Sequence, residues 1–240
     1  MNCVILQPSY IPWRGYFHQI YKADTFVFYD DVQYDRHGWR NRNRIKTPRG
    51  AQWLTIPLKS SGANWKNARI CDMQIAWDKP WNEAHFQTIR HNYAKAPFYK
   101  RYEGLLEKWF RSMPVTLADF TIETTVELAR ELGIRRTQFI RSSSLTCAGV
   151  KTDRLLSILR HVKATRYISG PSAKDYLETD KLDQEGIAVE WMEYKYPEYE
   201  QVHPPYDPQV SILDLLFSVG EDAGSFIWGG EQQRSFSVAI

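Results

Sequence analysis

The hydrophobic residues in the first third of the chain fall into short runs that polar and turn residues interrupt. Runs at residues 3–7 and 25–29 predict two buried strands, with a helix-like stretch over 15–22 between them. Further strands are predicted over residues 51–59 and 68–77. We therefore expect a β-rich insertion near residues 32–78, after the first strand–helix–strand unit.

From Pro80 onward the hydrophobic pattern takes a helical period. Proline suits the first position of a helix, and Trp81, His85 and Ile89 then recur every four residues. One face of this helix is therefore expected to be buried, with His85 as a core histidine. Two more helices are predicted over residues 99–112 and 117–132.

The rest of the chain alternates predicted strands and helices. The strands are expected at residues 137–143, 166–170 and 187–194, and the helices at 152–164 and 172–177. Parallel strands need crossover connections, so this rhythm predicts an α/β fold: a Rossmann-like, mostly parallel sheet with flanking helices. Ser211 and Asp214 occupy capping-box positions at the start of a closing helix.

Composition sets the class of protein. The 240 residues are 43% hydrophobic and 25% charged, without repeats or low-complexity tracts, which is typical of one globular domain over residues 1–240. No apolar stretch approaches the roughly 20 residues that cross a bilayer. Cys3, Cys71 and Cys147 are far apart and form no CxxC motif. They are typical of reduced thiols, so we expect a cytoplasmic protein with no membrane segment.

The segment "QPSYIPWRGYF", residues 7–17, follows the first predicted strand. In a doubly wound sheet this strand–helix turn is a frequent ligand site. Its two prolines stiffen the turn, and the other candidates are Gln7 as a donor and Tyr10, Trp13 and Tyr16 as aromatic walls. The alternative is that the prolines only shape a loop and the aromatic rings pack into the core.

Two carboxylates end the second predicted strand. Asp30 and Asp31 are adjacent, so their side chains point in opposite directions. One of them is a candidate for orienting a base, binding an amine or hydroxyl, or holding Mg²⁺, while the other caps the next turn. Gln33 and Tyr34 are neutral candidates for recognition of a sugar or an amide.

A basic segment follows. Residues 35–49 carry a net charge of +5 in a chain whose total is +3, which favours a local anionic ligand. In "WRNRNRIK" strand geometry puts one set of side chains on each face. One face carries Trp39, Asn41, Asn43 and Ile45, and the other carries Arg40, Arg42, Arg44 and Lys46. These forks and amides predict a pyrophosphate or nucleotide-sugar clamp; the alternative is a solvated edge strand.

Other polar residues are weaker candidates. Ser169, Ser172 and Lys174 surround a strand–turn–helix start that suits an anion, although Ser172 with Asp175 also fits an ordinary capping box. His37 and His203 are candidate general bases in predicted loops. No histidine pair has the spacing of a helical metal site, so no metal is expected.

Several blocks together resemble the WbqC-like protein family. These are "QPSYIPWRGYF", "FVFYDDVQY", "GWRNRNRIKTPRGAQWLTIPL", "YISGPSAKDYL" and "EYEQVHPPYDPQVSILDLLFSVG", which extend over nearly the whole chain. The resemblance implies an enzyme of bacterial O-antigen or other surface-polysaccharide biosynthesis. Many family members have histidine before Gln-Pro, but this chain has Leu6, so no catalytic role can rest on that histidine.

We interpret the chain as a transferase that moves a small acyl or aminoacyl group, such as glycyl, to the amine of a nucleotide-linked amino sugar. Arg40, Arg42 and Arg44 would hold phosphate, and Trp13 and Tyr16 would pack on a ring. The donor stays open, with an aminoacyl-tRNA among the candidates. One alternative is a nucleotidylyltransferase-like enzyme or ATP-dependent ligase that uses Mg²⁺ and ATP. Another is a non-catalytic protein that binds a nucleotide sugar or RNA.

Overall fold

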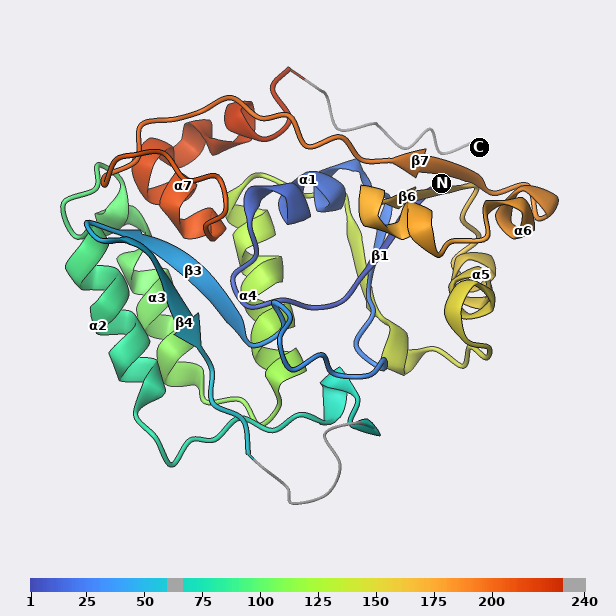
Figure 1. Ribbon diagram of the computed structural model, residues 1–240, viewed down its shortest axis with the longest axis horizontal. Coiled ribbons are helices and arrows are strands. Elements are labelled where there is room, and N and C mark those ends of the chain that lie inside the picture. The colour runs from blue at the N-terminus through green and yellow to red at the C-terminus, as the bar shows by residue number, and fades with distance from the viewer. Residues whose placement is uncertain (60–66, 231–240) are drawn as a thin grey trace.

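A five-stranded parallel sheet forms the centre of the molecule, in the order β5-β2-β1-β6-β7 (Figure 1). The computed structural model describes residues 1–59 and 67–230. The strands of this sheet are β1 (Asn2–Leu6), β2 (Thr25–Phe28), β5 (Gln138–Arg141), β6 (Arg166–Ser169) and β7 (Ala188–Trp191). The chain adds β2 and β5 on one side of β1 and then crosses to add β6 and β7 on the other. This arrangement confirms the predicted Rossmann-like, mostly parallel sheet.

Helices cover both faces of this sheet. They are α1 (Arg14–Lys22), α2 (Trp81–Tyr93), α3 (Tyr99–Ser112), α4 (Leu117–Glu131), α5 (Lys151–His161), α6 (Thr179–Gln184) and α7 (Ile212–Val219). Alternate residues of β1 face opposite layers: Val4 belongs to the core with α1 and α4, whereas Cys3 and Ile5 pack with α5 and α6. Figure 1 shows α1 and α4 to the left of the sheet and α5 and α6 to its right.

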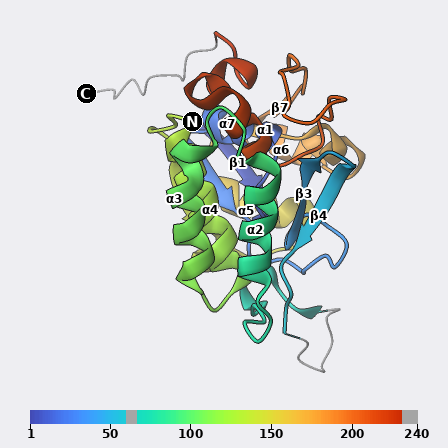
Figure 2. The same ribbon diagram turned by 90° about the vertical axis from the view of Figure 1, so that its left-hand side faces the viewer.

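The insertion after β2 contains an antiparallel hairpin of β3 (Arg42–Thr47) and β4 (Gly50–Thr55), beside α2 in Figure 2. The predicted strand over 68–77 is wrong, because Ile70–Asp72 forms a 3₁₀-helix. The buried Ile70 and Met73 are three residues apart, which suits one face of a 3₁₀ turn rather than an alternating strand. Residues 60–66 of the predicted insertion lie outside the described part of the chain.

The capping box predicted for the closing helix is only half correct. The Ser211 side chain accepts a bond from Leu213 N at the start of α7, as expected. Asp214, however, is fully buried and accepts hydrogen bonds of 2.7 Å from the hydroxyls of Tyr93 and Tyr199. Burial raises the pKa of this carboxyl. Asp214 therefore joins α7 to α2 and to the segment between β7 and α7 instead of capping its own helix.

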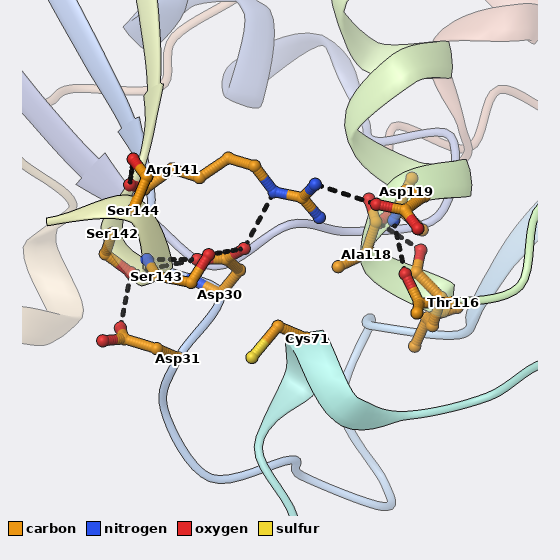
Figure 3. Close-up of polar contacts among 12 residues, drawn as sticks. Asp30, Asp31, Cys71, Thr116, Ala118, Asp119, Arg141, Ser142, Ser143 and Ser144 are labelled. Atoms are coloured by element: carbon orange, nitrogen blue, oxygen red, sulfur yellow. Dashed lines mark hydrogen bonds and ion pairs between the residues drawn. The ribbon is translucent and has the colours of Figure 1, made fainter.

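Asp30 locks the carboxyl ends of β2 and β5 together (Figure 3). Its fully buried carboxylate accepts hydrogen bonds from Arg141 Nε at 2.9 Å, Ser143 N at 2.9 Å and Ser143 Oγ at 2.8 Å. The same arginine reaches Asp119 on α4 at 2.8 Å. A buried carboxylate needs such a full set of donors, so Asp30 joins two strands and a helix.

Replacement of Asp30 should destabilise the protein. Asp30→Ala leaves Ser143 N–H without its acceptor and removes one of the two carboxylates that compensate Arg141, so we expect a loss of about 3 kcal/mol in the free energy of unfolding. Urea denaturation measures this value. The control is Asp72→Ala, which breaks the exposed ion pair with Arg69 and should cost less than about 1 kcal/mol. Equal losses in the two variants would contradict the structural role of Asp30.

His85 is the core histidine that the sequence predicts. It lies on α2, is 7% exposed, and its Nδ1 is 2.9 Å from the hydroxyl of the fully buried Tyr10. Burial lowers the pKa of its imidazole from 6.5 to about 4. The folded protein therefore keeps His85 neutral at pH values where the unfolded chain already binds a proton.

The free energy of unfolding should consequently decrease as the pH is lowered from 6.5 to 4. Above pH 6.5 neither state binds the proton, whereas below it only the unfolded state does until the folded pKa is reached. A shift of this size amounts to about 3 kcal/mol. Urea denaturation measures the free energy of unfolding at each pH. Between pH 6.5 and 4 the wild type should lose about 3 kcal/mol more of it than His85→Gln, which keeps an acceptor for Tyr10 but does not titrate. Parallel pH curves for the two proteins would argue against a neutral buried imidazole.

Candidate functional site

A cavity of about 650 Å³ lies at the carboxyl end of the sheet, where the strand order reverses between β1 and β6. Leu6 and Gln7 at the end of β1 line it, together with Tyr167 from β6. Connections from the two neighbouring strands leave in opposite directions at such a point, and a crevice remains between them. The volume is in the range of sites for small molecules.

Aromatic side chains form much of the cavity wall. They are Trp13, Tyr16, Tyr29, Trp39, Tyr167 and Tyr176. Trp13 immediately precedes α1, and Tyr16 in its first turn donates a hydrogen bond of 3.1 Å to the carbonyl oxygen of Gln7. Burial raises the pKa of Tyr16 and of Tyr167, so both phenols keep their protons at neutral pH. These rings therefore offer stacking faces and donors rather than bases.

Arg40 brings a positive charge to the same cavity. Its Nη1 donates to Gln7 O at 3.2 Å and Ser9 Oγ at 2.9 Å, which fixes the loop after β1. Its Nε has no hydrogen-bond partner in the described structure, and none of the ion pairs found there involves Arg40. Burial lowers the pKa of this guanidinium. The Asp35 carboxylate opposes this lowering electrostatically but forms no ion pair with Arg40, so the guanidinium remains suited to an anionic ligand.

Lys151 and Gln19 add complementary polar groups. Lys151 lines the cavity at the start of α5, with a backbone φ of 51°. Gln19 on α1 is 4% exposed and donates from Nε2 to the Tyr194 hydroxyl at 2.9 Å, but its Oε1 lacks a partner. Among the described lining residues there are thus two cations, an unsatisfied acceptor and no carboxylate.

Five of the residues predicted to bind a ligand come together here. They are Gln7, Trp13, Tyr16, Arg40 and Asn43. Tyr10 from the same turn instead belongs to the core, because its ring is fully buried against His85 and Phe120. The turn after β1 therefore serves both of the predicted alternatives: some of its aromatic residues line a cavity, and others pack inside.

The alternating basic segment divides between inward and outward faces. Asn41 and Asn43 point inward, where Asn41 Nδ2 donates to Ile56 O at 2.8 Å and Asn43 Nδ2 donates to Ile11 O at 2.7 Å. Arg42 and Arg44 are half-buried on the other face and do not line the cavity. Only Arg40 of the three predicted phosphate-binding arginines is at the cavity wall.

Lys46 departs from the predicted outward set. It is 3% exposed, because the loop that carries Pro205 covers it, and its Nζ donates to Pro205 O. Its backbone N–H also bonds to the Tyr93 hydroxyl at 2.8 Å. Lys46 thus lies inside the contact between the hairpin, α2 and this loop, away from the cavity lining.

None of the four predicted catalytic residues lines the cavity. Asp31 pairs with Arg154 on α5, whereas Asp30 pairs with Arg141 on β5. The predicted opposite orientation of the two carboxylates is wrong, because both residues lie beyond the end of β2 and the Ser142 hydroxyl bonds to each of them. His37 is exposed, and its backbone N–H bonds to Asp35 Oδ1 at 3.1 Å. His203 Nε2 is 2.9 Å from the carbonyl oxygen of Asn92 on α2. Their catalytic roles stay predictions.

The remaining predicted binding residues also lie outside the cavity lining. Gln33 is exposed and Tyr34 is buried. Ser169 is buried at the end of β6, whereas Ser172 and Lys174 are exposed on a 3₁₀-helix over Pro171–Asp175. Gly170 is the N-cap of that 3₁₀-helix, so Ser172 does not begin the predicted capping box. The cavity receives Tyr167 and Tyr176 from this region instead.

Several cavity residues were not predicted from the sequence. Gln19, Tyr29, Lys151, Tyr167, Tyr176 and Gln209 all line it. Tyr29 directly follows β2 and Tyr167 lies within β6, so an aromatic residue near the carboxyl end of a parallel strand was a usable signal. Lys151 and Gln209 carry no such local signal, because only the fold brings their loops to β1.

The described residues contain neither a metal-binding cluster nor a membrane-spanning helix. Residues 1–59 and 67–230 contain no group of three or more His, Cys, Asp or Glu side chains placed to hold a metal ion. In the same part of the chain, no helix has the length and apolar character needed to cross a membrane.

Comparison with known proteins identifies the family. The model of the WbqC-like protein family matches residues 7–226, which include most of the cavity lining. Uncharacterized protein Rv1507c of Mycobacterium tuberculosis (strain ATCC 25618 / H37Rv) is 37% identical over 225 residues, which cover 93% of this chain and 96% of that protein. No solved structure matches the chain. The chain belongs to the WbqC-like protein family.

Proposed function

We propose that this protein is a cytoplasmic enzyme of bacterial surface-polysaccharide (O-antigen) biosynthesis that acts on a nucleotide-linked amino sugar. It transfers a small acyl or aminoacyl group, such as glycyl, to the amine of that sugar. The observation that carries the proposal is the aromatic cavity at the sheet's switch point, with two cations and no carboxylate among its described lining residues. A nucleotide sugar presents the matching features of a base, two phosphates and a hydroxylated ring.

The lining residues divide naturally among the parts of such a ligand. Arg40 and Lys151 bind the diphosphate, and the unpartnered Nε of Arg40 is a donor for this contact. Trp13 and Tyr16 pack against a ring. Gln19 Oε1, which is buried and without a partner, accepts an N–H of the base or of the sugar amine.

The proposed reaction is ordinary acyl transfer. The sugar nitrogen attacks the acyl carbonyl carbon, a C–N bond forms, and the bond from that carbon to the donor's oxygen or sulfur breaks. The proton lost by nitrogen goes to the leaving atom. Because the described lining residues contain no imidazole or carboxylate, the protein's contribution here is to orient the amine and to donate hydrogen bonds to the developing oxyanion.

A second candidate has one observation in its favour. Trp13 and Tyr16 are at the start of α1, the place of the His-x-Gly-His turn in nucleotidylyltransferase-like folds, so the same cavity suits ATP. An ATP-dependent enzyme of this kind uses Mg²⁺. Without a carboxylate among the described lining residues, the metal's ligands would come mainly from the nucleotide and water.

Nucleotide-sugar binding should depend on Arg40. We expect UDP-linked amino sugars to raise the melting temperature of the wild type in a thermal-shift assay. Loss of the charged contact in Arg40→Gln should raise the dissociation constant roughly 10- to 100-fold. Lys151→Gln, at an exposed side chain, should weaken binding in the same direction without disturbing the fold. Arg49→Gln makes the same charge change at an exposed turn residue and serves as the control.

The proposal fails if no nucleotide sugar stabilises the wild type, or if Arg40→Gln and Lys151→Gln bind as well as Arg49→Gln. Mass spectrometry of reactions with an acyl-CoA or an aminoacyl-tRNA then separates catalysis from binding. An acylated sugar that forms without ATP supports the transferase. A product that requires ATP and Mg²⁺ supports the second candidate, and binding without any product supports a non-catalytic protein.

A further inference from the structure

Two tryptophans are exposed side by side at the β3–β4 hairpin: Trp53 on β4, and Trp39 in the segment that leads into β3. Trp39 is 42% exposed and Trp53 is 43% exposed, and their ring centres are 5.0 Å apart with an angle of 36° between the planes. The hairpin lies at one edge of the molecule, with α2 on its inner side (Figure 2). Such large rings are usually buried, so a pair of them at the surface indicates a binding surface.

Arginines surround this pair. In the strand register Arg44 is directly opposite Trp53, and Arg42 is two residues away on the same face. The guanidinium of Arg42 is 4.5 Å from the centre of the Trp53 ring, and that of Arg44 is 5.7 Å from it. No ion pair joins either arginine to a carboxylate within the described residues. Arg42 donates to the carbonyl oxygen of His37 and Arg44 donates to Gln209, so each charge is held by neutral acceptors only.

This chemistry is that of a single-stranded nucleic acid. Unpaired bases stack on aromatic rings, and arginine forks bind the phosphates between them. A carbohydrate chain also packs on tryptophan, but its hydroxyl groups do not call for unpaired cations. The positive charges of Arg42 and Arg44 beside the rings favour the phosphodiester chain over a neutral glycan.

The surface continues into the cavity. Trp39 belongs to both, because it also lines the cavity wall. Arg44 donates from Nε to Gln209 O at 2.9 Å and from Nη2 to Gln209 Oε1 at 2.8 Å, and Gln209 is another lining residue. A strand that stacks on Trp53 and Trp39 therefore has its end at the cavity mouth.

We infer that the outer face of the β3–β4 hairpin binds the single-stranded 3′ end of an RNA and directs its last nucleotide to the cavity. Trp39 and Trp53 stack two bases, and Arg42 and Arg44 bind phosphates. The inference rests on the proposed function in one respect: the RNA would carry an aminoacyl ester on its terminal ribose, and this ester would be the acyl donor. The RNA binding itself does not depend on the nucleotide sugar.

The test is fluorescence anisotropy with a labelled single-stranded RNA of 12 nucleotides, and with the same strand in a blunt duplex. We expect the single strand to bind more tightly, because duplex bases are already stacked and cannot reach the rings. Trp53→Ala and Arg44→Gln should each weaken binding roughly 5- to 100-fold. Trp53→Phe, which keeps an aromatic face, should restore most of the affinity lost in Trp53→Ala. Two neutralised phosphates predict a slope of about −1.4 for log K against log salt.

Arg111→Gln is the matched control, since it removes one exposed charge from α3 and should leave the affinity unchanged. Three results would overturn the inference: no binding at low salt, equal binding of duplex and single strand, or equal losses in Arg44→Gln and Arg111→Gln. If coenzyme A binds these rings under conditions in which the RNA does not bind, the rings are assigned to the adenine of that donor instead. Arg40→Gln tests nucleotide-sugar binding, and the hairpin variants test RNA binding. Failure of one proposal can therefore be distinguished from failure of the other.

Discussion

The cavity depends on the contact of Arg40 with the loop that follows β1. This guanidinium holds the carbonyl of Gln7 and the hydroxyl of Ser9 from a segment more than thirty residues later in the chain, so the loop and the basic segment form one wall. The contact uses only part of the donor set, and the charge has no carboxylate partner in the described structure. One residue thus both shapes the cavity and gives it an attraction for anions.

The inward face of the same segment explains why asparagine alternates with arginine there. Asn43 donates to the carbonyls of Tyr10 and Ile11, and Asn41 donates to that of Ile56. A buried carbonyl without a donor costs about 1–3 kcal/mol, so these amides stabilise a loop that has no regular secondary structure of its own. The inward amides hold the turn after β1 in place, and the outward arginines remain available to ligands.

The sequence was sufficient for the sheet and for several residues of the cavity at its carboxyl end. Strand–helix alternation predicts parallel strands, and the turn after the first strand of such a sheet is a common ligand site. Individual contacts were harder to predict. The hydrogen bonds of Asp30 to Arg141 and Ser143, more than a hundred residues away, are one example, because no local pattern reveals these partners. Lys151 and Gln209 reach the cavity only because the strand order reverses beside β1.

The two proposed binding surfaces share consecutive residues of the chain. Trp39 belongs to the exposed ring pair and the next residue, Arg40, holds the cavity loop. Gln209, which accepts hydrogen bonds from Arg44, also lines the cavity. If a partner bound at Trp39 and Arg44 also restricts Arg40, linkage requires that a ligand on Arg40 favour that partner to the same degree. An enzyme that joins groups from a long donor and a small acceptor benefits from this coupling, because it binds each most tightly when the other is present.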